Sequence, residues 1–302
     1  GQLINASGNG NFVLKNGTLK GARNYQLFSQ SGNGNFTIEG GVIDAEAQGV
    51  AVGVAGSSFT MTGGRIGTSK KSAHGVVSLS SQNIHIYGGL IQTTDSPALL
   101  IQTYRTDGQY GDLLIDGNAK IISDTNDAIQ MDTMQPITIG GNALIQGGGN
   151  DSSTTAALHS GSTASTDHHS ITIRDDAILV GDDYALMDSS VRSADNMDAV
   201  YLADITINGG HFLYKDGGLP FSESQRITYK ADESYAGNDP NQGYYILASE
   251  KGADSNYPEY YSLIKRSSLS HQDQYGIDRT YQDYEQLDYA IAAADAVLKK
   301  QS

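Results

Sequence analysis

The sequence SGNGNF occurs twice near the start of the chain, at residues 7–12 and again at 31–36. The copies begin 24 residues apart, and each ends on an apolar residue that opens an alternating apolar and polar run. Alternation of this kind is typical of β-strands, whose successive side chains point to opposite faces. An identical turn at a fixed distance indicates a repeated structural unit.

The same unit recurs along most of the chain. Three later segments keep the alternating run, a Gly-Gly pair and a second apolar position: SFTMTGGRI at 58–66, NIHIYGGLI at 83–91 and DITINGGHF at 204–212. A third apolar segment follows in each unit, as in PALLIQ at 97–102. The unit is therefore three short strands separated by turns rich in Gly, Asn, Asp and Ser. The first apolar position is occupied in turn by Phe12, Phe36, Phe59, Ile84, Leu113, Ile137, Ile171, Ile205 and Ile227.

Two architectures use repeated short strands. A propeller or sandwich needs antiparallel hairpins with longer strands, whereas a parallel β-solenoid stacks equivalent strands of successive coils. The short strands and the period of about 23–24 residues favour the solenoid, in which like side chains stack inside. We predict an all-β parallel solenoid of about nine coils.

The coil length, the three strands per unit and the Gly-Gly corners over residues 5–248 resemble the right-handed parallel β-helix of the pectate-lyase-like superfamily. This fold-level resemblance implies a polysaccharide site on one outer face. Lyases of this kind place acidic calcium ligands and a basic residue there, and the related hydrolases carry Gly-His-Gly and Arg-Ile-Lys motifs. The chain has neither motif, and its RDD sequence at 174–176 falls on a corner where other coils have glycine, so a turn is expected there.

Three segments are expected: a β-helix over 1–248, an irregular Tyr-rich cap or linker over 249–280, and a short α-helix over 281–302. The last segment has an apolar helical stripe, with Asp and Glu early and Lys late, as the helix dipole favours. It resembles the opening helix of helical repeat modules in large Gram-positive surface proteins. We therefore expect a monomeric part of a larger multidomain chain.

The composition limits the partners and the compartment. The formal net charge is −15, which argues against binding nucleic acid or an anionic membrane surface. The chain has no cysteine and no apolar run long enough for a membrane helix. An acidic, Gly-rich chain of this kind fits an extracellular protein, secreted or at a bacterial cell surface.

The candidate site lies where the loops are longest. Insertions at 102–112, 159–170 and 188–204 leave the same corner of the solenoid and are expected to wall a groove over the third strands. The outward row on its floor is predicted to be Ser78, Leu100, Gln130, His159 and Met187. The full set of expected ligand-binding residues is Gln102, Tyr104, Arg105, Gln130, Asp132, His159, His168, His169, Asp188 and Arg192.

Such a polar, mixed-charge groove suits a polysaccharide or other glycan. We predict a non-catalytic binding or adhesion module. The alternatives are a polysaccharide lyase or glycoside hydrolase using Asp132, Asp188 and Arg105, and a structural stalk without ligand. No metal site is predicted at His168 or His169 and no cofactor is expected, with calcium left open because two carboxylates supply few of its ligands.

Overall fold

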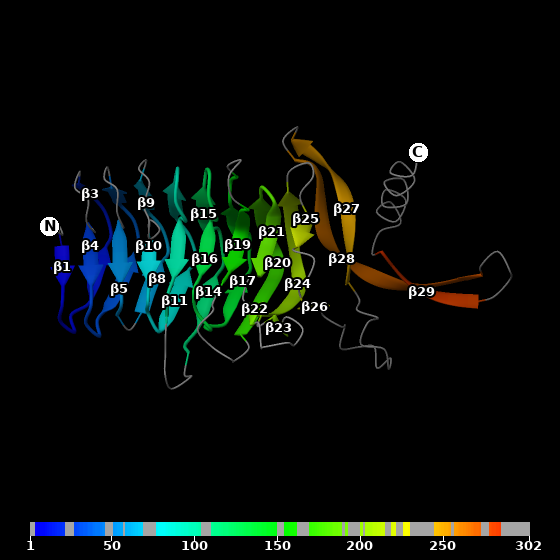
Figure 1. Ribbon diagram of the computed structural model, residues 1–302, viewed down its shortest axis with the longest axis horizontal. Coiled ribbons are helices and arrows are strands. Elements are labelled where there is room, and N and C mark those ends of the chain that lie inside the picture. The colour runs from blue at the N-terminus through cyan, green and yellow to red at the C-terminus, as the bar shows by residue number, and fades with distance from the viewer. Residues whose placement is uncertain are drawn as a thin grey trace.

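The computed structural model describes residues 4–21, 27–45, 51–56, 58–68, 77–103, 110–149, 154–161, 169–188, 191–192, 200–201, 203–214, 219–221, 226–229, 245–254, 257–272 and 278–284. These residues form a parallel β-solenoid whose strands stack along the long axis of the molecule (Figure 1). The predicted fold class is confirmed.

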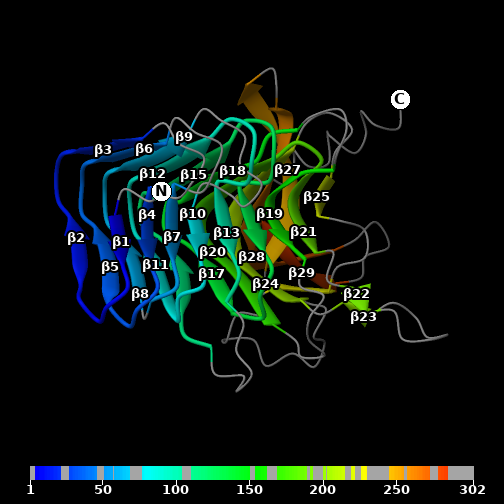
Figure 2. The same cartoon turned by 60° about the vertical axis from the view of Figure 1, so that its left-hand side comes forward.

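The third strands of successive coils form one sheet of nine parallel strands. In chain order they are β1 (Ile4–Ala6), β4 (Phe28–Gln30), β7 (Val52–Val54), β10 (Val77–Leu79), β13 (Leu99–Ile101), β16 (Ile129–Met131), β19 (Ala156–Ser160), β21 (Tyr184–Asp188) and β25 (Leu219–Phe221). We call it the third-strand sheet. Figure 2 shows it running along one side of the coils.

The first and second strands of each coil form the remaining walls. The first strands are β2 (Phe12–Leu14), β5 (Asn35–Ile38), β8 (Ser58–Met61), β11 (Asn83–Ile86), β14 (Leu113–Ile115) and β17 (Ile137–Ile139). The second strands are β3 (Thr18–Gly21), β6 (Val42–Ala45), β9 (Arg65–Thr68), β12 (Leu90–Thr93), β15 (Lys120–Ser123) and β18 (Leu144–Gln146). Both kinds continue into the long strands β20 (His169–Gly181) and β24 (Ala203–Tyr214), and β26 (Arg226–Tyr229) follows as a first strand.

Within the described residues, six coils have three separate strands each, where about nine coils were predicted in all. Coils one to six run from β2–β3–β4 to β17–β18–β19. In coil seven (β20 and β21) and coil eight (β24 and β25) the first two strands are merged. The corner between them persists in β20 as a register shift between Asp175 and Ile178.

Register places like residues directly above one another, as the repeat predicts. Phe36 pairs with Phe12 on one side and Phe59 on the other, and Phe59 pairs with Ile84. The ring centroids of Phe36 lie 5.0 Å from those of Phe12 and 5.7 Å from those of Phe59, with nearly parallel planes. Phe36, Phe59 and Ile84 are all fully buried. Burying each such side chain contributes about 1.5–3 kcal/mol, so the internal stack is the main source of stability.

The repeated SGNGNF turns also stack on each other. The backbone N–H of Asn35 donates to Oδ1 of Asn11 in the preceding coil at 3.0 Å. A Cβ on Gly34 would clash with the backbone oxygen of Gly10, whereas one on Gly10 would meet no atom within 4 Å. The second copy therefore needs glycine because the two turns lie in contact.

The corner predicted as a turn at residues 174–176 lies inside the long strand β20, at its register shift. Asp175 has a φ of 58°, where coils five and six have Gly117 and Gly141 at φ values of 62° and 60°. Asp tolerates this left-handed conformation better than most residues. Its Oδ2 accepts a hydrogen bond from the N–H of Gly141 at 3.1 Å, which ties the corner to the coil before it.

After the solenoid the chain forms antiparallel strands, which include much of the segment predicted as an irregular Tyr-rich cap or linker over 249–280. They are β27 (Tyr245–Asp254), β28 (Tyr257–Gln272) and β29 (Asp278–Tyr284). Part of β28 pairs with 211–213 in β24, so it extends the edge of the last coil. Tyrosine-rich segments favour strands, and an open sheet edge offers unpaired backbone groups. The first four residues of the predicted helix, 281–284, belong to β29. The rest of it, 285–302, lies outside the described residues.

Candidate functional site: the outer face of the third-strand sheet

The predicted outward row lies in register on the third-strand sheet. Ser78 pairs with Leu100, Leu100 with Gln130, Gln130 with His159, and His159 with Met187. Leu100 is buried, while the other four are half-buried. We call this surface, together with Gln102 and Asp132, the third-strand face. Because each strand belongs to a different coil, the side chains come from segments far apart in sequence.

Gln102 and Asp132 form the second row at the ends of β13 and β16. Their backbone N–H groups continue the parallel ladder, donating to the carbonyls of Leu79 and Ile101 at 2.8 Å each. Both side chains are exposed, and Nε2 of Gln102 donates to Oδ2 of Asp132 at 3.5 Å. The two predicted residues therefore lie side by side, with an amide and a carboxylate available to a ligand.

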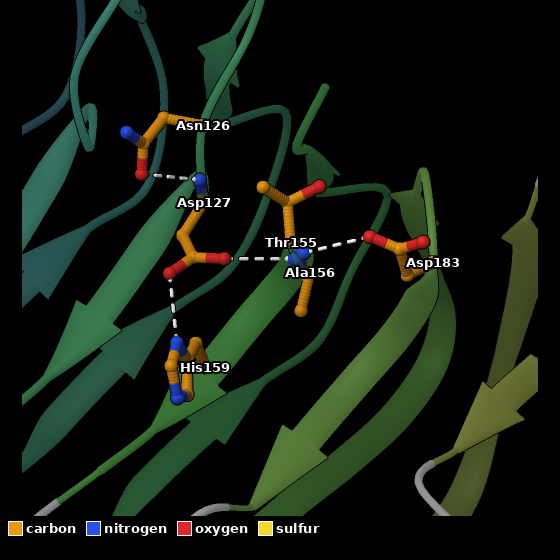
Figure 3. Close-up of polar contacts among 6 residues, drawn as sticks. All are labelled: Asn126, Asp127, Thr155, Ala156, His159 and Asp183. Atoms are coloured by element: carbon orange, nitrogen blue, oxygen red, sulfur yellow. Dashed lines mark hydrogen bonds and ion pairs between the residues drawn. The ribbon is translucent and has the colours of Figure 1, made fainter. Parts of the chain in front are cut away.

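His159 is held from the side by Asp127, a residue outside the predicted set. Nδ1 of His159 lies 2.8 Å from Oδ2 of Asp127, and Oδ1 of the same carboxylate accepts from the N–H of Ala156 at 2.7 Å (Figure 3). The side chains are 20% exposed for His159 and 8% for Asp127. A nearly buried carboxylate thus links coil five to coil six and orients the ring.

Two further side chains secure the same corner. Oδ1 of Asn126 accepts from the N–H of Asp127 at 2.9 Å, and Oδ2 of Asp183 accepts from the N–H of Thr155 at 2.9 Å (Figure 3). The Asn126 contact lies within coil five, and the Asp183 contact joins coils six and seven just before their third strands. Both contacts are to backbone N–H groups, and neither involves a side chain of the third-strand face.

The structure separates Asp188 from this face. Asp188 pairs with Ser160, which pairs with Met131, and all three are buried. It therefore belongs to the inward row, because it lies two residues after the buried Leu186 on the same strand. The acidic pair expected for catalysis, Asp132 with Asp188, does not share a surface.

Several expected residues fall outside what the structure describes. Tyr104, Arg105 and His168 are not among the described residues, and neither are most of the loops expected to wall a groove. The backbone of His169 begins β20, away from the third-strand sheet, and Arg192 lies in β22 (Val191–Arg192), which pairs with β23 (Val200–Tyr201). Their side chains are not described.

The third-strand face carries one carboxylate, Asp132, and no lysine or arginine side chain is described beside it. Side chains of lysine and arginine are described only on or next to strands of the other walls, at Lys15, Lys20, Arg65, Lys120 and Arg174. Within the described residues, no three His, Asp or Glu side chains converge so as to hold a metal ion. Across that same part of the chain, no helix has the length and apolar character needed to cross a membrane.

The fold defines the chain as a parallel β-solenoid protein. No family model matches the sequence, and no curated protein or solved structure matches it. The resemblance to the pectate-lyase-like superfamily stays a prediction from the sequence, and a fold alone does not define a function.

Proposed function

We propose that this solenoid binds a polysaccharide or glycan along its third-strand face and does not cleave it. The in-register polar row carries the proposal: Gln130 and His159 adjoin each other, with the exposed pair Gln102 and Asp132 at the next outward position. Amide, carboxylate and imidazole groups together supply donors and acceptors for sugar hydroxyls. Parallel strands about 4.8 Å apart repeat these groups along a rigid surface, which favours an extended ligand.

A neutral glycan fits this face better than an acidic one. The formal net charge of the chain is −15, and Asp132 adds a carboxylate at the site itself. A field of that sign lowers the local concentration of polyanions. The same acidity, with the absence of cysteine, supports placement outside the cell, secreted or at a bacterial surface.

The two carboxylates predicted for an enzyme, Asp132 and Asp188, do not face the same surface. A glycosidase needs two carboxyl groups on either side of the scissile bond. Asp132 faces outward, and Asp188 is buried in the inward row. Lyase or hydrolase activity would appear as product release in the test below.

The test is a binding screen read together with product release. Arabinoxylan, polygalacturonate and mucin glycans are compared by affinity electrophoresis, with new reducing ends and unsaturated products measured in parallel. We expect a neutral glycan to be retarded without products, and Gln130→Ala and Asp132→Ala each to weaken binding about fivefold or more, as loss of a hydrogen bond does.

Thr172→Ala is the matched control, because Thr172 lies in the outward row of the first strands. It should leave affinity unchanged. Product release that Asp132→Ala abolishes would replace the proposal with an enzyme. Absence of binding across the screen would leave the stalk as the better account.

A further inference from the structure

The Asp127–His159 pair is specific to one place in the repeat. Register aligns Asp127 with Pro97 in coil four, Ala156 in coil six and Tyr184 in coil seven, so of these four coils coil five alone has a carboxylate there. His159 is likewise the one histidine in its outward row among the described coils. A feature needed merely to stack coils would be expected at several of these positions.

The chemistry of the pair fixes the state of the ring. An ionised carboxylate only accepts hydrogen bonds, and both groups facing Asp127 are nitrogens: the N–H of Ala156 and Nδ1 of His159. The proton shared with Oδ2 therefore sits on Nδ1. In the neutral ring Nε2 is then the acceptor, because imidazole carries a single proton.

The geometry also fixes where the ring stands. His159 is a half-buried member of the outward row, between Gln130 and Met187, while the Asp127 side chain is almost fully buried behind it. The Asp127 carboxylate also accepts from the N–H of Ala156 at the start of β19. The His159 ring is therefore fixed relative to β19, the strand on which it lies. This is the arrangement by which a buried acid orients a histidine at a ligand site.

We propose that Asp127 is a positioning residue of the glycan site, which holds His159 on the third-strand face in the Nδ1–H tautomer and so sets how the ring recognises sugar hydroxyls. The inference rests on the proposed function for its effect on binding, whereas the tautomer is a property of the protein alone. The two can therefore fail separately.

Asp127→Asn is the decisive variant. The two contacts of Asp127 are made by different carboxylate oxygens, and an asparagine has an oxygen at one of these positions and an NH₂ group at the other. Keeping the backbone contact turns its NH₂ group toward Nδ1 and favours the opposite tautomer. Asp183→Asn is the matched control. Asp183 accepts a hydrogen bond from the backbone N–H of Thr155 in the adjacent coil, of a length comparable to the Ala156–Asp127 bond (Figure 3). A loss of stability from weakening such a contact should be similar in both variants.

The first readout is the ¹⁵N chemical shifts of the His159 ring at mildly alkaline pH, without ligand. We expect the Nδ1–H tautomer in the wild-type protein and in Asp183→Asn, and the Nε2–H tautomer in Asp127→Asn. The opposite tautomer in the wild type, or no change in Asp127→Asn, would overturn the inference whatever the protein binds.

The second readout is affinity for the neutral glycan retained most strongly in the screen above. We expect Asp127→Asn to lose about fivefold or more. The affinity of Asp183→Asn for this glycan should stay within twofold of the wild-type value. The denaturation midpoints of the two variants should be equal. A flipped tautomer with unchanged affinity would refute the role in recognition. If no glycan is retained, the proposed function fails, and a tautomer result as expected still supports the positioning of His159.

Discussion

Replacing Gly34 by alanine tests whether the coils stack as closely as described. A Cβ at this position would overlap the backbone oxygen of Gly10 and come within 2.7 Å of Nε2 of Gln30, which is itself buried. Backbone cannot move aside as a flexible side chain can. Overpacking a well-packed interior costs about 1–3 kcal/mol, and the backbone obstacle places Gly34→Ala near 2–3 kcal/mol.

Gly10→Ala is the control, because Gly10 occupies the same position in an identical hexapeptide. Its Cβ would meet nothing within 4 Å, and its φ is not in the left-handed region. Removing glycine from an unstrained site restricts the unfolded chain, so we expect no loss or a gain of up to about 1 kcal/mol. Both variants are measured by urea denaturation followed by far-ultraviolet circular dichroism. Equal effects at the two positions would refute the stacked-turn arrangement.

Two further substitutions probe the same stack. Phe36→Ala should cost about 3–5 kcal/mol in the same denaturation assay, since Phe36 is fully buried between rings, whereas Val13→Ala should change stability by less than about 0.5 kcal/mol because Val13 is 46% exposed. A Phe36 effect no larger than that of Val13 would contradict the internal stack. Asp175→Val should cost about 1–2 kcal/mol more than Asp175→Gly, because a β-branched residue does not tolerate a φ of 58°. Equal melting temperatures for these two variants would contradict the left-handed corner.

The sequence predicts the repeat, the core positions and the outward row because all three depend on local periodicity. Phe36 and Phe59 are recognisable from alternation alone, and so are Gln130 and His159 on the opposite face. The corner at Asp175 is predictable because glycine occupies its equivalents. Each inference needs only the pattern within one coil and its position in the next.

The remaining features depend on pairing between coils and on where strands end. Asp127 reaches His159 only because parallel register places it beside Ala156 of the following coil. The signal in the sequence is an acidic residue two positions before β16, where the equivalent residues of other coils are Pro97 and Tyr184. Asp188 was assigned to a loop, and β21 extends far enough to turn it inward.

The central claim is that the third-strand face is the glycan-binding surface. Its most direct measurement is a titration of isotope-labelled protein with the retained glycan, observing the side-chain amide signals of Gln102 and Gln130 and the ring signals of His159. We predict saturable shifts of all three with one common dissociation constant, and no shift of the Thr138 or Thr172 methyl signals on the first-strand face. Shifts confined to those threonines, or glycan binding that moves none of the three side chains, would contradict the account.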